Sequence, residues 1–223
     1  HIFFQNDYDR IYFSKSKKNM NNFSLIPGSG IDLKKYEYKK IPVDNTYFLF
    51  VGRLIKDKGV LELINAIKLI KYKYHRKDIN FLIVGDYDYK NPSSIPKKII
   101  EESIKEKIFT HLNFKSDIKK ILINSNCVIL PSYREGMSRI LIEALAIGRP
   151  IITTNVPGCL EMVKENWNGF LVEPKNEISL AEKIIKFYDL SYSNKLNFSN
   201  NSRKLSSFYD VLKVIDCYKE IIL

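Results

Sequence analysis

The stretch "YFLFVGRLIKDKGVLELINAI", Tyr47 to Ile67, predicts a buried strand, a turn between two glycines and an amphipathic helix. Its first five residues are apolar without alternation, which is typical of a parallel strand covered on both faces. After Gly59 the apolar residues recur at helical spacing, at Val60, Leu63, Ile64, Ile67 and Ile70. A strand followed at once by a helix is the repeating unit of α/β domains.

Three further apolar runs repeat this pattern, namely Phe81–Val84, Cys127–Leu130 and Ile151–Thr154, and helical patterns separate them. We therefore expect an α/β fold, a doubly wound, Rossmann-like parallel sheet with helices on both faces. Gly52 and Gly85 directly follow the first two runs. Because ligands bind at the carboxyl ends of the strands in such sheets, the functional residues should gather at one edge.

The composition is that of a globular protein. Of its 223 residues, 45% are hydrophobic and 13% aromatic, which is sufficient for a core. We find no signal peptide pattern and no apolar run of the roughly 18 residues that span a bilayer. Cys127, Cys159 and Cys217 lack metal-ligand spacing and indicate a reducing cytoplasm. The formal charge of +11 indicates an anionic partner, although lysines on solvated helix faces would also account for it.

The two ends of the chain are less regular. "HIFFQND", His1 to Asp7, has the character of a strand with no element before it, so we interpret the sequence as part of a longer protein. After Pro174 the pattern is helical and polar, with an expected break in the Asn/Ser-rich segment Asn194–Ser202. A last amphipathic helix should follow, bearing Phe208, Val211, Leu212 and Ile215.

Two cations and a helix N-terminus are candidate anion sites. Arg53 and Lys58 are five positions apart beside the end of the first strand, where together they could neutralise a diphosphate. "EGMS", Glu135 to Ser138, opens a helix, and a helix N-terminus offers unpaired amides and a positive dipole end. Gly136 lets the backbone approach a ligand, so the amides near Met137 and Ser138 could face an anion.

Glu135 and Glu143 are candidate ligands for hydroxyl groups. In a continuous helix they would be about 12 Å apart, and each carboxylate can accept two hydrogen bonds from a sugar. A buried carboxylate needs a partner, because an uncompensated charge in an apolar setting is costly. The alternative interpretation is that Glu143 pairs with Arg139, one turn earlier, and that Glu135 is a surface loop residue.

Five segments, in this order and spacing, resemble the family 4 glycosyltransferases, which are retaining enzymes with the two-domain GT-B architecture. The resemblance is to their C-terminal, nucleotide-sugar-binding domain, and it runs from about Pro27 to Pro174. The segments are "PGSGID", "FVGRLIKDKGVLELINAI", "FLIVGD", "LPSYREGMSRILIEALAIGRPIITTNVPG" and "NGFLVEP". The glutamate, seven residues, glutamate pattern in the fourth segment is the signature of the family.

The resemblance implies a role for each site residue. Glu135 would contact the hydroxyls of the donor sugar and Glu143 those of the ribose. Arg53 and Lys58 would hold the diphosphate and stabilise it as leaving group. The remaining donor-binding positions are Gly52, Gly85, Gly136, Met137 and Ser138, and the backbone of the last three would assist. Many relatives read Glu-Gly-aromatic-Gly where this chain has Met137 and Ser138, which leaves the shape of the sugar pocket open.

The family implies no metal and no cofactor beyond the nucleotide-sugar donor, here expected to be a UDP-sugar. "GDYDYKNPSSI" and "REGMSR" look most like bacterial members that extend lipid-linked or capsular glycans, often from UDP-N-acetylhexosamines. Their acceptor would be a polyprenyl-diphosphate-linked sugar. We therefore expect a cytoplasmic protein, peripheral at the inner face of the membrane, whose basic surface suits an anionic leaflet.

The resemblance also implies a domain organisation. Residues 1–26 would be a remnant of the N-terminal domain and linker, 27–200 the donor-binding domain, and 201–223 a helix that crosses back to the absent domain. The isolated chain should bind donor and catalyse little, because the acceptor half of the cleft is missing.

Two other classes share the fold or the charge. A nicotinamide dehydrogenase is disfavoured, because no G-x-G-x-x-G follows the first strand and the histidines are scattered. His111 is more typical of a packed histidine than of a base. We expect no nucleic-acid partner, since the aromatic residues occur in apolar runs rather than among basic residues. The alternative function is a non-enzymatic nucleotide- or nucleic-acid-binding Rossmann-like module.

Overall fold

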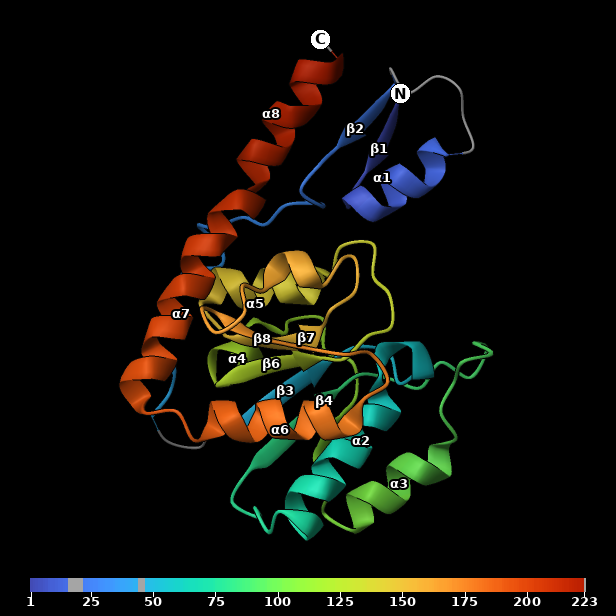
Figure 1. Ribbon diagram of the computed structural model, residues 1–223, viewed down its shortest axis with the longest axis vertical. Coiled ribbons are helices and arrows are strands. Elements are labelled where there is room, and N and C mark those ends of the chain that lie inside the picture. The colour runs from blue at the N-terminus through green and yellow to red at the C-terminus, as the bar shows by residue number, and fades with distance from the viewer. Residues whose placement is uncertain (16–21, 44–46, 223) are drawn as a thin grey trace.

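The computed structural model describes residues 1–15, 22–43 and 47–222 (Figure 1). Its centre is a six-stranded sheet with the strand order β5-β4-β3-β6-β7-β8, in which every pairing is parallel. The strands are β3 Tyr47–Val51, β4 Asn80–Val84, β5 Thr110–Leu112, β6 Cys127–Leu130, β7 Ile151–Thr154 and β8 Gly169–Val172. The predicted doubly wound parallel sheet is confirmed, and each of the four predicted strands forms.

The strands missed from the sequence are the two at the edges of this sheet. β5 has three residues, of which Thr110 and His111 are polar, and β8 begins with Gly169, so neither gives a continuous apolar run. The central strands form the core. Phe48 in β3 stacks on Phe81 in β4 with ring centroids 5.6 Å apart, and Leu49 is fully buried. Burial of each such side chain contributes about 1.5–3 kcal/mol.

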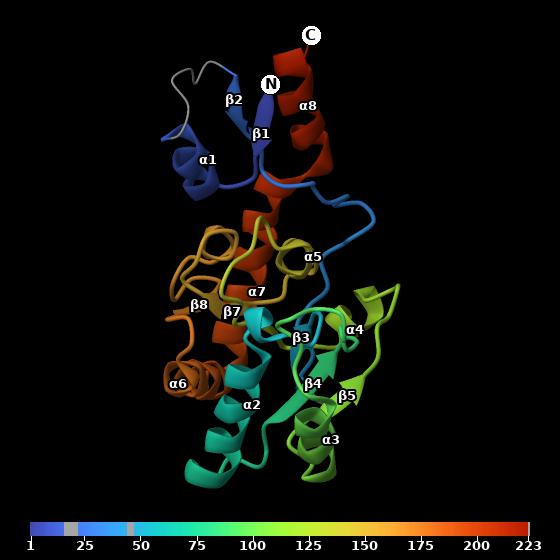
Figure 2. The ribbon, with the colours of Figure 1, turned by 90° about the vertical axis from the view of Figure 1, so that its right-hand side faces the viewer.

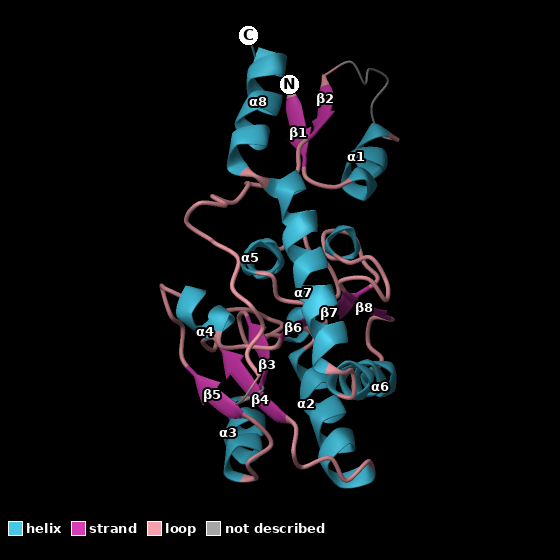
Figure 3. Cartoon of the chain, turned by 90° about the vertical axis from the view of Figure 1, so that its left-hand side faces the viewer, coloured by secondary structure: helices cyan, strands magenta, loops and turns pink. Residues whose placement is uncertain are grey.

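Helices cover both faces of the sheet. In Figure 1, α5 lies above the strands, whereas α2 and α6 lie below them. α7 packs against α5, and Figure 3, turned by 90° from Figure 1, shows α5 end-on beside α7. The helices of this part of the chain are α2 Val60–Lys68, α3 Lys97–Lys105, α4 Lys119–Ile123, α5 Arg139–Ile147, α6 Glu177–Tyr188 and α7 Tyr192–Ser206. The two layers bury the sheet, as its continuous apolar strands predict.

Helix α2 begins where the sequence predicts, directly after Gly59. Gly59 has φ +68°, and a Cβ at this position would lie 2.0 Å from the Pro131 carbonyl oxygen. Only glycine fits here, so the turn after β3 can come close to the end of β6. The predicted apolar face, including Leu63, Ile64 and Ile67, is buried. The turn therefore holds Arg53 and Lys58 near the loop that follows β6.

The Asn/Ser-rich segment Asn194–Ser202 was predicted to break the helical pattern, and this prediction is wrong. α7 runs through it without interruption. Ser199 and Ser202 are fully buried, and small side chains let α7 approach α5 closely. Tertiary packing here outweighs the weak helix propensity of the segment. The predicted boundary at residue 200 thus lies inside a helix.

The first residues form a separate small unit, which we call the N-terminal unit. It consists of β1 Ile2–Phe4, α1 Asp7–Ser14 and β2 Phe23–Leu25, with β1 and β2 paired in parallel apart from the main sheet. The last helix, α8 Val211–Ile222, lies beside it in both Figure 1 and Figure 2. The Phe3 and Tyr218 rings are 4.7 Å apart. The last helix of the chain therefore packs against its first strand.

The predicted last helix forms, although it starts at Val211, after a 3-10 turn at Ser207–Tyr209. Leu223, where we expected it to end, lies outside the described residues. Among the residues that the structure describes, no helix is long and apolar enough to cross a membrane.

Candidate functional site

The carboxyl ends of β3 and β4 meet at the edge where ligand-binding residues were expected. Gly52 follows β3 and Gly85 follows β4. Gly85 has φ +154°, and a Cβ there would lie 1.9 Å from the Gly52 carbonyl oxygen. The two strand ends are therefore in direct backbone contact, which only glycine at position 85 allows.

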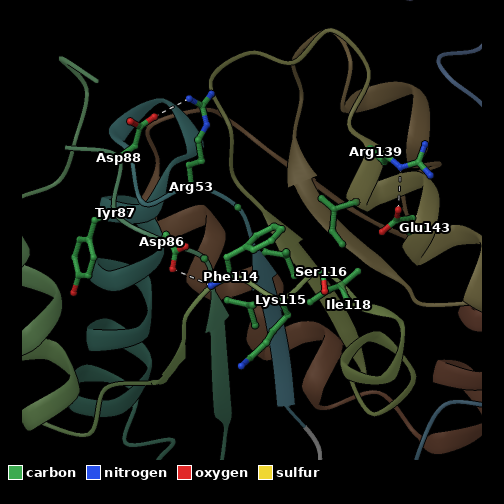
Figure 4. Close-up of a pocket in the computed structure, with 15 residues that line it drawn as sticks. Arg53, Asp86, Tyr87, Asp88, Phe114, Lys115, Ser116, Ile118, Arg139 and Glu143 are labelled. Atoms are coloured by element: carbon green, nitrogen blue, oxygen red, sulfur yellow. Dashed lines mark hydrogen bonds and ion pairs between the residues drawn. The ribbon is translucent and has the colours of Figure 1, made fainter. Parts of the chain in front are cut away.

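A cavity of about 550 Å³, which we call the Glu143 cavity, opens at this edge (Figure 4). Its walls come from the ends of β3 and β4, from the loop at residues 114–118 and from α5. Gly52, Gly85 and Glu143 line it as predicted. Figure 4 shows Glu143 and Arg139 on one side of the cavity, and Arg53 and Asp88 on the other.

Glu143 is only 7% exposed and needs the partner that its burial predicts. Its Oε1 accepts a hydrogen bond from Nε of Arg139 at 3.1 Å, so this pairing from the alternative interpretation is present. Burial raises the pKa of the Glu143 carboxyl, while the charge of Arg139 and a hydrogen bond from Tyr36 oppose the rise. The Arg139 side chain is 58% exposed. An ion pair open to solvent on one side contributes little energy, so it leaves Glu143 available to a ligand.

A second cavity, of about 520 Å³, lies beside the first, and we call it the Glu135 cavity. Lys58, Glu135 and Gly136 line it. The Glu135 side chain is 12% exposed, and its Oε1 accepts hydrogen bonds from Lys58 Nζ at 2.5 Å and from Ser132 Oγ at 2.7 Å. Glu135 does lie in a loop, as the alternative interpretation supposes, but its side chain is largely buried and its carboxylate is paired within the protein.

Arg53 lines both cavities and so lies where they meet. Its guanidinium is 60% exposed, and Nη1 donates to Oδ2 of Asp88 at 2.9 Å. Arg53 and Lys58, the two predicted diphosphate ligands, each have a carboxylate partner. One Asp88 oxygen occupies a single donor of Arg53, and the rest of the guanidinium fork is available to an anion.

The segment between Glu135 and Glu143 is only partly helical. α5 begins at Arg139, so the estimate of about 12 Å, which supposes a continuous helix, does not apply to this arrangement. The Ser138 amide, expected to face an anion, donates to the Gly158 carbonyl instead. Within the described residues the amides of Gly136 and Met137 make no hydrogen bond. These two amides remain the candidates for backbone contact with a ligand.

Met137 and Ser138 line neither of the two cavities. Met137 lines a third cavity, of about 370 Å³, between the N-terminal unit and the 3-10 turn at Ser207–Tyr209. Ser138 is buried directly before α5. The predicted part of Met137 in donor binding therefore rests on its backbone amide, whereas the Ser138 amide is already bonded to the Gly158 carbonyl.

Several residues of the site received no role from the sequence. Asp88 lies in the quoted segment Gly85–Ile95, yet its contact with Arg53 crosses 35 residues and leaves no local pattern. Ser132 lies two residues after the end of β6, and its place at a strand end is a signal that could have been used. Tyr36, near Glu143, has no such signal.

The structure also places the histidine and the cysteines that the sequence singled out. His111 packs in β5, with Nε2 2.8 Å from the Gly85 carbonyl oxygen, and does not reach either cavity. Cys127, Cys159 and Cys217 are free thiols. In the described parts of the chain, no three His, Cys, Asp or Glu side chains come together as a metal site would need.

The structure is an α/β domain with two cavities at the carboxyl edge of its sheet, and comparison with known proteins identifies its family. Residues 34–205 match the family model described as "Glycosyl transferases group 1". The chain belongs to this family.

Among its curated relatives is the capsular polysaccharide biosynthesis glycosyltransferase CapM of Staphylococcus aureus, 31% identical over 79% of this chain and 47% of that protein. Another is the N,N'-diacetylbacillosaminyl-diphospho-undecaprenol alpha-1,3-N-acetylgalactosaminyltransferase of Campylobacter jejuni, 28% identical over 85% of this chain and 51% of its own length. The chain thus spans about half the length of these relatives.

The solved structure of Anabaena HepE in complex with UDP and glucose shares the fold. Its TM-score is 0.83 over 98% of this chain and 61% of that protein, at 20% sequence identity. Such structural neighbours are GT-B glycosyltransferases, so the expected relation to the GT-B fold is confirmed. The names of the two curated relatives refer to capsular polysaccharide biosynthesis and to a sugar linked to diphospho-undecaprenol.

Proposed function

We propose that this chain is the donor-binding part of a retaining glycosyltransferase that uses a nucleoside-diphosphate sugar, with UDP as the nucleotide. The observation that carries the proposal is the arrangement of the two cavities, which meet at Arg53. Glu143 lies in one cavity, and Glu135 lies in the other. A nucleotide sugar has the same order of parts: a nucleoside, a diphosphate and a sugar.

In this proposal the nucleoside occupies the Glu143 cavity, and the Glu143 carboxylate accepts hydrogen bonds from the ribose hydroxyls. The diphosphate lies at the junction, beside Arg53 and Lys58. The sugar occupies the Glu135 cavity, where the Glu135 carboxylate accepts from its hydroxyls. The choice of UDP is supported by the UDP bound in the structural neighbour HepE.

The proposed chemistry uses the two cations. When the bond between the anomeric carbon and the diphosphate oxygen breaks, negative charge develops on the leaving diphosphate. Arg53 and Lys58 stabilise that charge from fixed positions, which is the way most electrostatic catalysis works. The hexose or N-acetylhexosamine then bonds to the oxygen of an acceptor hydroxyl with retention of configuration, and the proton of that hydroxyl passes to the leaving diphosphate. Neither step requires a metal ion in this proposal.

The proposed acceptor is a glycan or a sugar linked to a polyprenyl diphosphate, bound by a second domain that the relatives' greater length supports. The name of the Campylobacter relative, which includes a diphospho-undecaprenol, supports the lipid-linked choice. The enzyme would then work at the cytoplasmic face of the membrane. The net charge of +11 favours contact with an anionic leaflet.

A calorimetric ligand panel tests this function. We expect UDP and one or more UDP-sugars to bind, GDP and NAD to bind at least about tenfold more weakly, which corresponds to about 1.4 kcal/mol, and single-stranded DNA not to bind. Preferential binding of GDP would mean that the donor nucleotide is GDP and not UDP. Binding of DNA alone would favour the nucleic-acid-binding alternative and contradict the proposal.

A further inference from the structure

The loop that carries Glu135 is held from two sides. On one side lies the turn at Pro157 and Gly158. The Glu135 amide donates to the Pro157 carbonyl at 3.3 Å, and the Ser138 amide donates to the Gly158 carbonyl at 3.1 Å. Gly158 has φ +79°, and a Cβ there would lie 2.3 Å from the Glu135 carbonyl oxygen. The turn therefore packs directly against the loop.

On the other side lies the N-terminal unit, far away in sequence. Asn6 Nδ2 donates to the Gly136 carbonyl at 2.8 Å, across 130 residues. Arg134 Nη2 donates to Asp9 Oδ1 at 2.6 Å, across 125 residues. These two contacts hold the residues directly before and after Glu135. In Figure 1, α1 accordingly lies above the loops that precede α5.

Asn6 and Asp9 are themselves held in place. The Asn6 side chain accepts from the Asp9 amide at 2.8 Å, which caps α1, and its Nδ2 also donates to Asp9 Oδ2 at 2.9 Å. Asn6 is 2% exposed, so its amide group is withdrawn from solvent. The cap fixes which end of the amide is the acceptor, and the Nδ2 group must then face Gly136.

Capping alone does not require asparagine. Serine is as good a cap at this position, yet it has no second donor that reaches the Gly136 carbonyl. The Asp9 carboxylate accepts hydrogen bonds from both Asn6 and Arg134, and neither of these bonds is needed to cap the helix. The network links the helix N-terminus to both neighbours of Glu135.

We propose that Asn6 and Asp9 are positioning residues that orient Glu135 toward the donor sugar through the loop at residues 134–136. This inference rests on the proposed function, in which Glu135 binds the sugar. Its consequence is that recognition of the sugar depends on the N-terminal unit, whereas recognition of the nucleoside, in the Glu143 cavity, does not. Packing of the N-terminal unit against this loop would thereby be coupled to the affinity for the donor sugar.

The test uses the 223-residue chain and three variants on the same helix turn. Asn6→Ser keeps the cap and removes the donor to Gly136, and Asp9→Asn removes the charge that pairs with Arg134. Asp7→Asn is the matched control, because Asp7 pairs with Arg10 inside α1 and does not contact the loop. Calorimetry measures the affinity of each variant for UDP, UDP-glucose and UDP-N-acetylglucosamine.

We expect Asn6→Ser and Asp9→Asn to weaken UDP-sugar binding at least about threefold, the scale of one lost hydrogen bond, while UDP binding stays unchanged. Asp7→Asn should change neither. In the Glu135→Gln background the two changes should add no further loss, since they act through Glu135. Equal effects on UDP and UDP-sugar, effects matched by Asp7→Asn, or additivity with Glu135→Gln would overturn the inference.

Hydrogen exchange of residues 133–138, measured in the chain without nucleotide, distinguishes failure of the positioning network from failure of the proposed role of Glu135. Asn6→Ser and Asp9→Asn should speed exchange of the Glu135 and Ser138 amides, and Asp7→Asn should not. Unchanged exchange would show that the network does not hold the loop, which contradicts positioning. Faster exchange with unchanged sugar affinity, and no effect of Glu135→Gln, would instead contradict the proposed role of Glu135.

Discussion

The Nζ atom of Lys58 lies 2.5 Å from Oε1 of Glu135, although 77 residues separate them in sequence. The sequence assigns these residues to different parts of one ligand, Lys58 to the diphosphate and Glu135 to the sugar. The side chains are 21% and 12% exposed, so each neutralises a charge that would otherwise be largely buried. In the proposed function, this pair holds both side chains where the diphosphate and the sugar of the donor meet.

Lys58→Ala should weaken binding of UDP far more than binding of uridine. The change removes a charge-assisted hydrogen bond, worth about 1.5–3 kcal/mol, and leaves the Glu135 carboxylate facing the diphosphate without a counter-charge. Arg53→Ala should act in the same direction. Calorimetry measures the affinity of each variant for uridine and for UDP. If both affinities fall equally, the assignment of Lys58 and Arg53 to the diphosphate is contradicted.

Glu143→Gln should stabilise the protein at pH 7. Burial raises the folded pKa of the Glu143 carboxyl above its unfolded value, so its contribution to stability is present below the unfolded pKa and is lost as the pH rises through the folded pKa. A glutamine side chain does not ionise, so the variant does not lose this stability as the pH rises. The difference in Tm between variant and parent should be positive at pH 7 and shrink as the pH falls to about 4, near the unfolded pKa of glutamate.

A lower Tm of Glu143→Gln at pH 7 would mean that its pairing with Arg139 outweighs the cost of burial. The matched control is Glu101→Gln, because Glu101 forms an exposed ion pair with Lys97 at the same i,i+4 spacing. That change should alter Tm little at either pH.

Arg149→Ala should destabilise the fold by at least about 2 kcal/mol. Arg149 is fully buried after α5, and its guanidinium donates to backbone carbonyls of Lys40, Leu122, Gly148 and Ile123. The change leaves these carbonyls without the donor and opens a cavity. Arg149→Lys should recover only part of the loss, because an ammonium lacks the guanidinium fork. Urea unfolding measures both, and a loss below about 1 kcal/mol for alanine would contradict the structural role.

The sequence predicted the fold where local pattern and tertiary structure agree. Continuous apolar runs such as Cys127–Leu130 became buried central strands, whereas Thr110–Leu112, short and polar at the sheet edge, gave no signal. Asn194–Ser202 misled the prediction, because burial of Ser199 against the main body is a tertiary effect. Local composition cannot report such packing.

Part of the candidate site was predicted from the sequence, but most of the pairings between its side chains were not. Arg53, Lys58, Glu135 and Glu143 all line the two cavities. The partners Asp88 for Arg53 and Asn6 for Gly136 join segments distant in sequence, and no spacing rule reveals them. Only the pairing of Arg139 with Glu143, one helical turn apart, could be foreseen.

The 223-residue chain alone should transfer no sugar at a useful rate, although we expect it to bind the donor. Transfer requires donor and acceptor at near-attack distance, and such positioning supplies roughly 7–11 kcal/mol of barrier lowering. Closure of a second domain would also exclude water. The measurement is transfer from UDP-sugars to a lipid-linked acceptor, with EDTA, for this chain and for a longer one that includes the second domain. Rapid transfer by this chain alone, or inversion at the anomeric carbon, would contradict the proposal.

The central claim is that the two glutamates bind opposite ends of one donor. Its most direct test is to measure, by calorimetry on the same chain, the affinity of Glu143→Gln and Glu135→Gln for UDP and for UDP-sugar. Glu143→Gln should weaken both ligands by a similar factor, because both contain the ribose. Glu135→Gln should leave UDP binding unchanged and abolish the additional affinity that the sugar provides. If both variants behave alike, or if neither changes any affinity, the claim is contradicted, and the pairing of Glu143 with Arg139 is then structural.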